Sequence, residues 1–217
     1  MAIFTVIGLG SFGQTIALEL TRLGHDVIGI DTNQRNIEDV ADRVTHAVIA
    51  DATDEKVLEE LNVQKSEAAI VAIGEDIEAS ILCVLNLKNL GIHQVWVKAK
   101  TKSHHTILAH LGVEKIIHPE EDMGIRIAQT LSYPMVSRYM ALANDHFIVK
   151  VIIHEKMKGV NLHGLMGKYT EEIRIILVQR DKHIFYTISE DFTLEPNDIL
   201  IVEGRQHDLQ KLSSSFQ

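Results

Sequence analysis

The chain is poor in the residue types that mark secreted or membrane-spanning proteins. Cys83 is its single cysteine in 217 residues, which excludes an intramolecular disulfide framework and fits a reducing cytosol. No apolar run approaches the roughly 18 residues that a membrane-spanning helix needs. Residues 1–4 show no charged region ahead of an apolar one. We therefore expect a cytoplasmic protein that reaches any membrane partner from outside the bilayer.

A surplus of positive charge is also missing. The formal net charge is -9, and neither a basic stripe nor a helix-turn-helix pattern is present, which argues against a nucleic-acid binder or a transcriptional regulator. The length allows one good core and a small second domain, and it leaves no room for a large substrate domain.

The most informative motif is a glycine-rich turn at residues 8–13, the glycine loop, which lies between a strand-like run at 3–7 and a helix-like run at 14–23. In such loops the first glycine permits a tight turn, the second lets backbone approach a pyrophosphate, and the third allows close packing of strand and helix. Asp31 ends the next apolar run, where a ribose-binding carboxylate is expected. The pattern predicts a site for NAD, ATP, ADP or AMP, because Asp31 would repel a 2'-phosphate.

Short apolar runs alternate with helical patterns as far as residue 118, which is typical of a parallel sheet with crossover helices. The expected strands are 3–7, 27–31, 47–51, 69–74, 95–99 and 115–118. Gly24, Gly91, Gly112 and Asn62 stand where the intervening helices would end in the left-handed conformation. The predicted fold class is α/β: a Rossmann-like, doubly wound parallel sheet followed by a small α+β domain.

The second half of the chain changes character after the sixth expected strand. Residues 121–142 have a helical pattern interrupted at 132–134, and strands are expected at 147–153, 173–179, 183–188 and 199–203. We predict a nucleotide-binding domain at 1–119, connecting and dimerisation helices at 120–143, and a regulatory domain at 144–217. The apolar strands of this small domain exceed what its core can bury, which favours self-association.

Several motifs, taken in order, resemble the RCK family, also called the TrkA-N/TrkA-C family. These are the glycine loop, Asp51-Ala52-Thr53, residues 71–74, Val97-Lys98-Ala99 and residues 118–123. Members are cytosolic regulatory subunits of Ktr/Trk-type potassium transporters and channels. The resemblance implies a non-enzymatic gating subunit, a homo-oligomer built from dimers into a ring of eight. It would lie at the inner face of the cell membrane through an integral-membrane potassium transporter subunit, with ligand-driven rearrangement of the ring controlling potassium flux.

The resemblance also assigns residues to an ATP/ADP or NAD(H) site. The glycine loop would hold the phosphates, Asp31 the ribose, and Asp51 with Ala52 the adenine edge, while Glu120 would approach the phosphates through a cation such as Mg2+. The candidate nucleotide-binding residues are Gly8, Leu9, Gly10, Ser11, Phe12, Gly13, Asp31, Thr32, Asp51, Ala52, Ala72, Ile73, Gly74 and Lys98.

The sequence departs from the family pattern in two places. Ser11 stands where Ktr-like members commonly carry an arginine that reaches the terminal phosphate of ATP, and serine cannot supply that charge. Residues 166–169 read Met-Gly-Lys-Tyr, whereas members that sense cyclic di-AMP show an Arg-Ala-Lys-Tyr-like run. We therefore do not expect cyclic di-AMP binding, and ATP, ADP and NAD all remain candidate ligands.

Other interpretations remain for some of these features. Asp31 and Asp51 are also good helix caps, and the helix-start acids near Glu120 fit simple dipole stabilisation. His104, His105 and His110 suggest zinc, but adjacent helical residues point about 100° apart, and no cysteine or carboxylate completes a ligand spacing. A surface helix is expected instead. A small NAD-dependent reductase is the alternative function.

An interface between subunits is expected in the helices 123–128 and 136–142. Its apolar series is Ile125, Ala128, Leu131, Met135, Tyr139 and Leu142. Burial of these side chains within the chain's own fold is the alternative.

Overall fold

The computed structural model describes residues 1–132, 136–142, 145–167 and 172–215. The chain divides into two compact units, Met1–Pro119 and Glu120–Gln217. Each unit is described by itself below.

The first unit is a parallel six-stranded sheet with the order β3-β2-β1-β4-β5-β6. Its strands are β1 (Ile3–Ile7), β2 (Asp26–Asp31), β3 (His46–Ile49), β4 (Ala68–Val71), β5 (Val95–Lys98) and β6 (Lys115–Ile117). Its helices are α1 (Ser11–Arg22), α2 (Gln34–Glu38), α3 (Glu55–Glu60), α4 (Ile77–Asn89) and α5 (Lys102–His110), with a short 3-10 turn at Val63–Lys65. From β1 the strands are added toward one edge of the sheet as far as β3, and from β4 they are added toward the other edge, as in a doubly wound fold.

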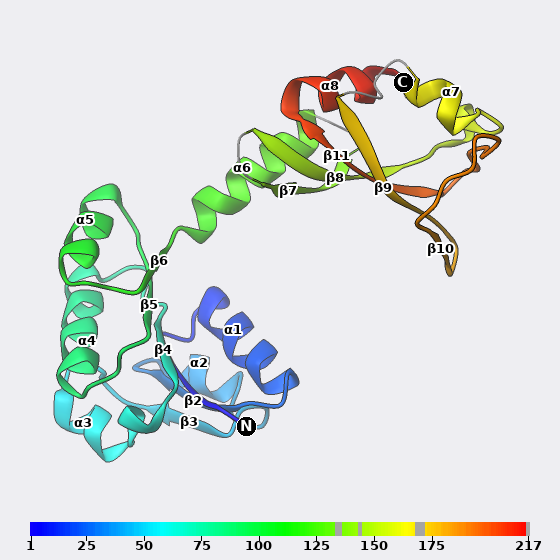
Figure 1. Ribbon diagram of the computed structural model, residues 1–217. Helices are drawn as coiled ribbons and strands as arrows, with labels where there is room; N and C mark the ends of the chain where they lie inside the picture. Colours follow the sequence, from blue (N-terminus) through cyan, green and yellow to red (C-terminus); the bar gives the residue numbers. More distant parts are fainter. Residues whose placement is uncertain (133–135, 143–144, 168–171, 216–217) are drawn as a thin grey trace. The chain divides into compact units, whose positions relative to one another are not determined.

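Both faces of this sheet carry helices (Figure 1). Leu58 of α3, Leu87 of α4 and Leu108 of α5 are fully buried against one face. Ala17 of α1 and Ile37 of α2 pack on the other face. The predicted Rossmann-like class is confirmed, because near-continuous apolar strands need cover on both sides.

The predicted helix ends are also confirmed. Gly24, Gly91 and Gly112 have φ values of 87°, 81° and 66°, and Asn62 has a φ of 55°. Only residues that tolerate the left-handed region stop a helix in this way. Helices α1, α3, α4 and α5 are thus each ended by a residue close to their own last turn.

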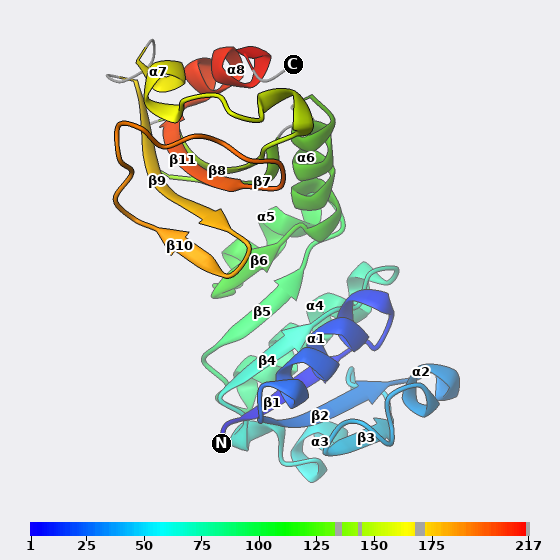
Figure 2. The same ribbon diagram turned by 90° about the vertical axis from the view of Figure 1, so that its right-hand side faces the viewer.

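The second unit contains an antiparallel sheet with the order β10-β9-β11-β8-β7. Its strands are β7 (Val136–Ala141), β8 (His146–Ile152), β9 (Ile173–Arg180), β10 (His183–Phe185) and β11 (Ile199–Arg205). Its helices are α6 (Pro119–Ser132), α7 (Leu162–Met166) and α8 (Gln206–Ser215), with a 3-10 turn at Glu155–Met157. The small α+β domain was predicted correctly as a class, and Figure 2 shows α7 and α8 beside the sheet.

One face of this sheet forms the second core. Leu162 of α7 and Leu212 of α8 are buried with Val149, Val178 and Leu200 from three of the strands. At the border of the core, the fully buried Asp198 carboxylate accepts two hydrogen bonds from the Arg180 guanidinium, at 2.8 and 2.7 Å. The bonds with Asp198 raise the pKa of Arg180. This pair fixes the turn into β11 to the end of β9.

The prediction of helices throughout 120–143 was partly wrong. Residues Val136–Ala141 form strand β7, which pairs antiparallel with β8. The apolar spacing of this segment fits a helix, but pairing with β8 gives its backbone groups partners, and tertiary context overrides such short patterns. Within the expected interface series, Ile125, Leu131 and Leu142 are exposed, whereas residue 135 and the predicted interruption at 133–134 lie outside the described residues.

Candidate nucleotide site at the carboxyl edge of the parallel sheet

The glycine loop is shaped by close backbone contacts that exclude side chains. Gly8 has a φ of 87°, and a Cβ placed there would lie 2.9 Å from the Ile73 backbone nitrogen. A Cβ on Gly13 would lie 1.9 Å from the Gly8 carbonyl oxygen. By contrast, a Cβ on Gly10 would meet nothing within 4 Å. The first and third glycines therefore serve the fold, while open space lies in front of the second.

Helix α1 begins directly after Gly10, and its N-terminus is left open to an anion. Gly10 makes no side-chain cap, and no acidic residue lies in the first turn. The first backbone N–H groups of a helix have no intrahelical partners, and they carry a partial positive charge. This end of α1 can accept a phosphate group.

Asp31 at the end of β2 is fastened to the glycine loop. Its Oδ2 accepts hydrogen bonds from the Leu9 backbone N–H at 2.6 Å and from Asn36 Nδ2 at 3.1 Å. Its Oδ1 accepts from the Asn33 backbone N–H at 2.7 Å. The helix cap of α2 is Asn33, not Asp31, because Asn33 Oδ1 accepts from the Arg35 N–H. The carboxylate is thus held in place beside the loop.

Asp51 lies at the end of the neighbouring strand and is stabilised by Thr53. The Thr53 hydroxyl and backbone N–H donate to Asp51 Oδ1 at 2.7 and 2.9 Å. Both hydrogen bonds lower the pKa of Asp51, and the bond from the Thr53 hydroxyl has the larger effect. Asp54 caps α3, so the capping alternative for Asp51 is wrong. Asn86 of α4 donates to the Thr53 carbonyl at 2.8 Å and holds this turn in place.

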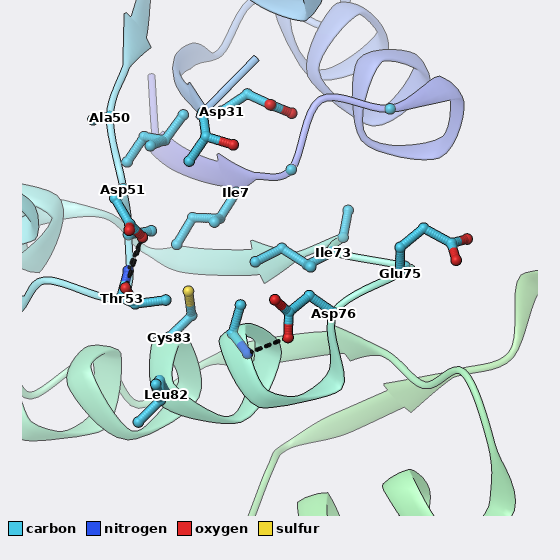
Figure 3. Close-up of a pocket in the computed structure, with 18 of the residues that line it drawn as sticks. Ile7, Asp31, Ala50, Asp51, Thr53, Ile73, Glu75, Asp76, Leu82 and Cys83 are labelled. Carbon is cyan, nitrogen blue, oxygen red and sulfur yellow. Dashed lines mark hydrogen bonds between the residues drawn. The ribbon is translucent and has the colours of Figure 1, made fainter.

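A cavity of about 640 Å³ lies among the loops that follow β1, β2, β3 and β4, and we call it the edge cavity. Figure 3 shows Asp31, Asp51 and Asp76 around it, with Ile7 and Ile73 between them and the Cys83 sulfur pointing inward. The predicted residues that line it are Gly8, Gly10, Asp31, Thr32, Asp51, Ala52, Ala72, Ile73 and Gly74. The structure thus brings together four segments that lie far apart in the sequence.

The remaining candidates lie beside the cavity or apart from it. Leu9 is fully buried, and Ser11, Phe12 and Gly13 belong to the beginning of α1. Lys98 Nζ lies 5.8 Å from the Phe12 ring centroid, and 3.4 Å from where a Gly74 Cβ would be. Glu120 stands in the first turn of α6 in the second unit, and its contact with phosphate stays a prediction.

Comparison with known proteins decides the family. The TrkA-N domain matches residues 4–119. The chain belongs to the TrkA-N family. The resemblance to RCK regulatory subunits that the motifs indicated is thereby confirmed.

Two curated relatives match this TrkA-N chain along nearly its whole length. The Ktr system potassium uptake protein A of Bacillus subtilis (strain 168) is 37% identical over 97% of this chain and 95% of its own length. The Ktr system potassium uptake protein C of the same organism is 36% identical over 96% and 94%. A solved structure of the GsuK channel bound to NAD covers 100% of this chain and 39% of its own, with a TM-score of 0.62 and 15% identity. At that identity it shows the fold alone.

Sequence reasoning missed the part of the edge cavity that comes from α2 and from the beginning of α4. Asp76, Glu78 and Cys83 line it, and so does Asn36. The signal for α4 was present, because Asp76 follows the fourth apolar run where a helix cap is expected. Burial raises the pKa of Cys83 to about 12, and the Asp51 charge adds to the shift. The thiol therefore stays protonated and is a poor nucleophile at neutral pH.

The histidines do not form a metal site within the part of the chain that the structure describes. The expectation of a surface helix fails for His104, which is 1% exposed. Burial, and secondarily the charge of His118, lower the pKa of His104. None of the described helices is both long and apolar enough to cross a bilayer.

Proposed function

We propose that this TrkA-N chain is the nucleotide-binding regulatory subunit of a Ktr-type potassium uptake system. The observation that carries the proposal is the joining of Asp31 to the glycine loop, through the 2.6 Å bond to the Leu9 N–H, at the rim of the edge cavity. A carboxylate held beside an uncapped helix N-terminus is suited to a ribose linked to a phosphate. Full-length similarity to two potassium uptake proteins supplies the biological setting.

The ligand is an adenosine nucleotide, ATP, ADP or NAD(H). The open space before Gly10 and the N-terminus of α1 would receive the phosphates. Asp31 would accept the ribose hydroxyls, and the wall formed by Ala52 and Ile73 would contact the base. Mg2+ at the phosphates, with Glu120 as a ligand, is part of this proposal, because a carboxylate facing phosphate is repulsive without a cation between them.

Regulation requires two arrangements of an assembly that differ in affinity for the ligand. The assembly would be a homo-oligomer, a dimer or a ring of eight, bound from the cytoplasm to an integral-membrane potassium transporter subunit. Exposed apolar side chains on α6 and β7, such as Ile127 and Met140, support a contact between subunits. A coupling of about 1–3 kcal/mol is usual for such control.

The site is suited to binding more than to catalysis. A reductase needs a proton donor or acceptor within hydrogen-bond reach of its substrate. Burial raises the pKa of the Cys83 thiol in the cavity to about 12, so the thiol is too weak an acid to donate a proton readily and does not act as an acceptor at neutral pH. The reductase alternative is tested by oxidation of NADH with a panel of small carbonyl compounds. Turnover there would overturn the regulatory proposal.

The direct test combines binding and transport. Calorimetric titration with ATP, ADP, NAD and NADP, with and without Mg2+, should show binding below millimolar for ADP and NAD, binding below millimolar for ATP when Mg2+ is present, and weaker binding for NADP. Labelled-potassium flux through the reconstituted transporter should then depend on the bound nucleotide. If no nucleotide binds with a dissociation constant below millimolar, or if a nucleotide that binds leaves the potassium flux unchanged, the proposed function is wrong.

A further inference from the structure

The edge cavity has an acidic lining. Its charged residues, within the described part of the chain, are Asp31, Asp51, Glu75, Asp76 and Glu78, and neither lysine nor arginine is among them. Lys98 Nζ lies 3.4 Å from where a Gly74 Cβ would be, and Lys98 does not line the cavity. Such a lining opposes a ligand in proportion to the ligand's negative charge.

Among the helices that begin at the edge cavity, α1 and α4 differ in whether their N-termini are open to phosphate. The beginning of α1 has neither a side-chain cap nor an acidic residue. The beginning of α4 is capped by Asp76, whose Oδ1 accepts from the Ala79 N–H at 2.9 Å, and Glu78 lies in its first turn. The chain's own carboxylates therefore occupy the positive end of α4 that a second anionic group would need.

The acidic groups differ in how far their charges are compensated. Glu75 points outward, away from Ile7 and Cys83 (Figure 3), and Lys100 pairs with it at 2.6 Å. Asp76 is held at the rim by its capping bond, while Glu78 is exposed. Asp76 and Glu78 thus set the electrostatic potential that a ligand meets on the α4 side.

We infer that the edge cavity selects adenosine 5'-phosphate ligands of low negative charge, AMP or NAD+, over ATP, and that Asp76 and Glu78 determine this selectivity. ATP carries two more phosphate groups than AMP and is accepted well only when a divalent cation offsets their charge. The inference rests on the proposed nucleotide site, and it assigns the ligand class of that site.

The test compares ligand affinities in a buffer that contains EDTA. In the wild-type protein AMP and NAD+ should bind more tightly than ATP. The double variant Asp76→Asn/Glu78→Gln removes both charges and keeps a good helix cap. It should tighten ATP binding about 10-fold and AMP binding less than about 3-fold, because the repulsion grows with ligand charge. Added Mg2+ should narrow the gap in the wild-type protein.

The matched control is Glu59→Gln/Glu60→Gln on α3, which makes the same change in charge at exposed positions that do not line the cavity. It should leave every affinity within about two-fold, because neither side chain lines the cavity and salt screens charges that are exposed to solvent. Glu78→Gln alone repeats the test without touching the cap, should the double variant fail to fold.

The outcomes separate the two claims. ATP binding more tightly than AMP in EDTA, or an equal change for ATP and AMP in the double variant, would overturn the charge selectivity while leaving the nucleotide site intact. Absence of binding by every adenosine ligand, in the wild-type protein and in the variants, would overturn the proposed function itself.

Discussion

Asp31 in the first unit and Asp198 in the second each accept three hydrogen bonds, and the donors differ in kind. Asp198 takes two of its bonds from the Arg180 guanidinium and the third from the Glu195 N–H. Asp31 takes its bonds from two backbone N–H groups and the Asn36 amide, all uncharged, and it faces a cavity. The second unit therefore neutralises its buried carboxylate with a cation, whereas the first unit holds its carboxylate with uncharged donors at the edge cavity.

The largest effect is expected from breaking the structural carboxylate. Asp198→Ala removes two of the hydrogen bonds of the Arg180 guanidinium, leaves it only Glu195 and the Thr193 carbonyl, and takes the acceptor from the Glu195 N–H. It should lower the free energy of unfolding of the second unit by about 4 kcal/mol. Urea denaturation followed by circular dichroism measures this loss. Nucleotide affinity in the first unit should stay within about two-fold, since distant sites usually act independently. A loss of stability below about 1 kcal/mol would remove the distinction between the two aspartates.

The next effect concerns the loop to which Asp31 is fastened. Gly13→Ala places a Cβ 1.9 Å from the Gly8 carbonyl oxygen, and such overpacking should cost about 3 kcal/mol of stability in the first unit and abolish nucleotide binding. Gly10→Ala is the matched control, because its Cβ meets nothing in the protein. It should preserve the melting temperature and still weaken phosphate binding. Equal destabilisation by both variants would contradict the separate roles of these glycines.

Removal of the Asp31 carboxylate, which lines the edge cavity, should affect binding more than folding. Asp31→Ala should weaken every adenosine ligand about 30-fold, which corresponds to about 2 kcal/mol. The wild-type protein should also prefer ADP over 2'-deoxy-ADP, and the variant should lose that preference. Calorimetry measures both. A variant that still discriminates the two ligands would show that Asp31 only supports the loop.

The smallest effect tests the neutral residue at the beginning of α1. Ser11→Arg adds a cation beside the phosphate end and should shift the ratio of ATP to ADP affinities toward ATP by about 5-fold, the range of a charge-assisted contact at an exposed position. Ser11→Gln supplies similar length without charge, and we expect it to leave the ratio unchanged. An unchanged ratio in Ser11→Arg would mean that the terminal phosphate lies away from this position.

Much of the first unit could be predicted because its signals are local. Strand runs bounded by turns, and glycines that end helices, act within a few residues, so the six strands and the stops at Gly24, Gly91 and Gly112 follow from the sequence. The site could be predicted only where a motif marks it. Asn36 and Asp76 escaped notice because their part in the cavity depends on how α2 and α4 approach the sheet edge.

The errors share a physical cause. Segment Val136–Ala141 has a periodicity compatible with helix or strand, and the backbone partner offered by β8 decided between them. His104 lies in an amphipathic pattern that reads as surface, yet packing of α5 on the sheet buries it. Neither outcome could be read from neighbours in the chain.

The sequence by itself determined the doubly wound sheet and the shape of the glycine loop, because both depend on backbone conformations that only certain residues adopt, and it placed a carboxylate, Asp31, at the end of β2. Tertiary structure alone decided the chemistry around that loop. It brought the capped end of α4 to the same cavity as the uncapped end of α1, and electrostatic forces act between groups that folding brings close, whatever their distance along the chain.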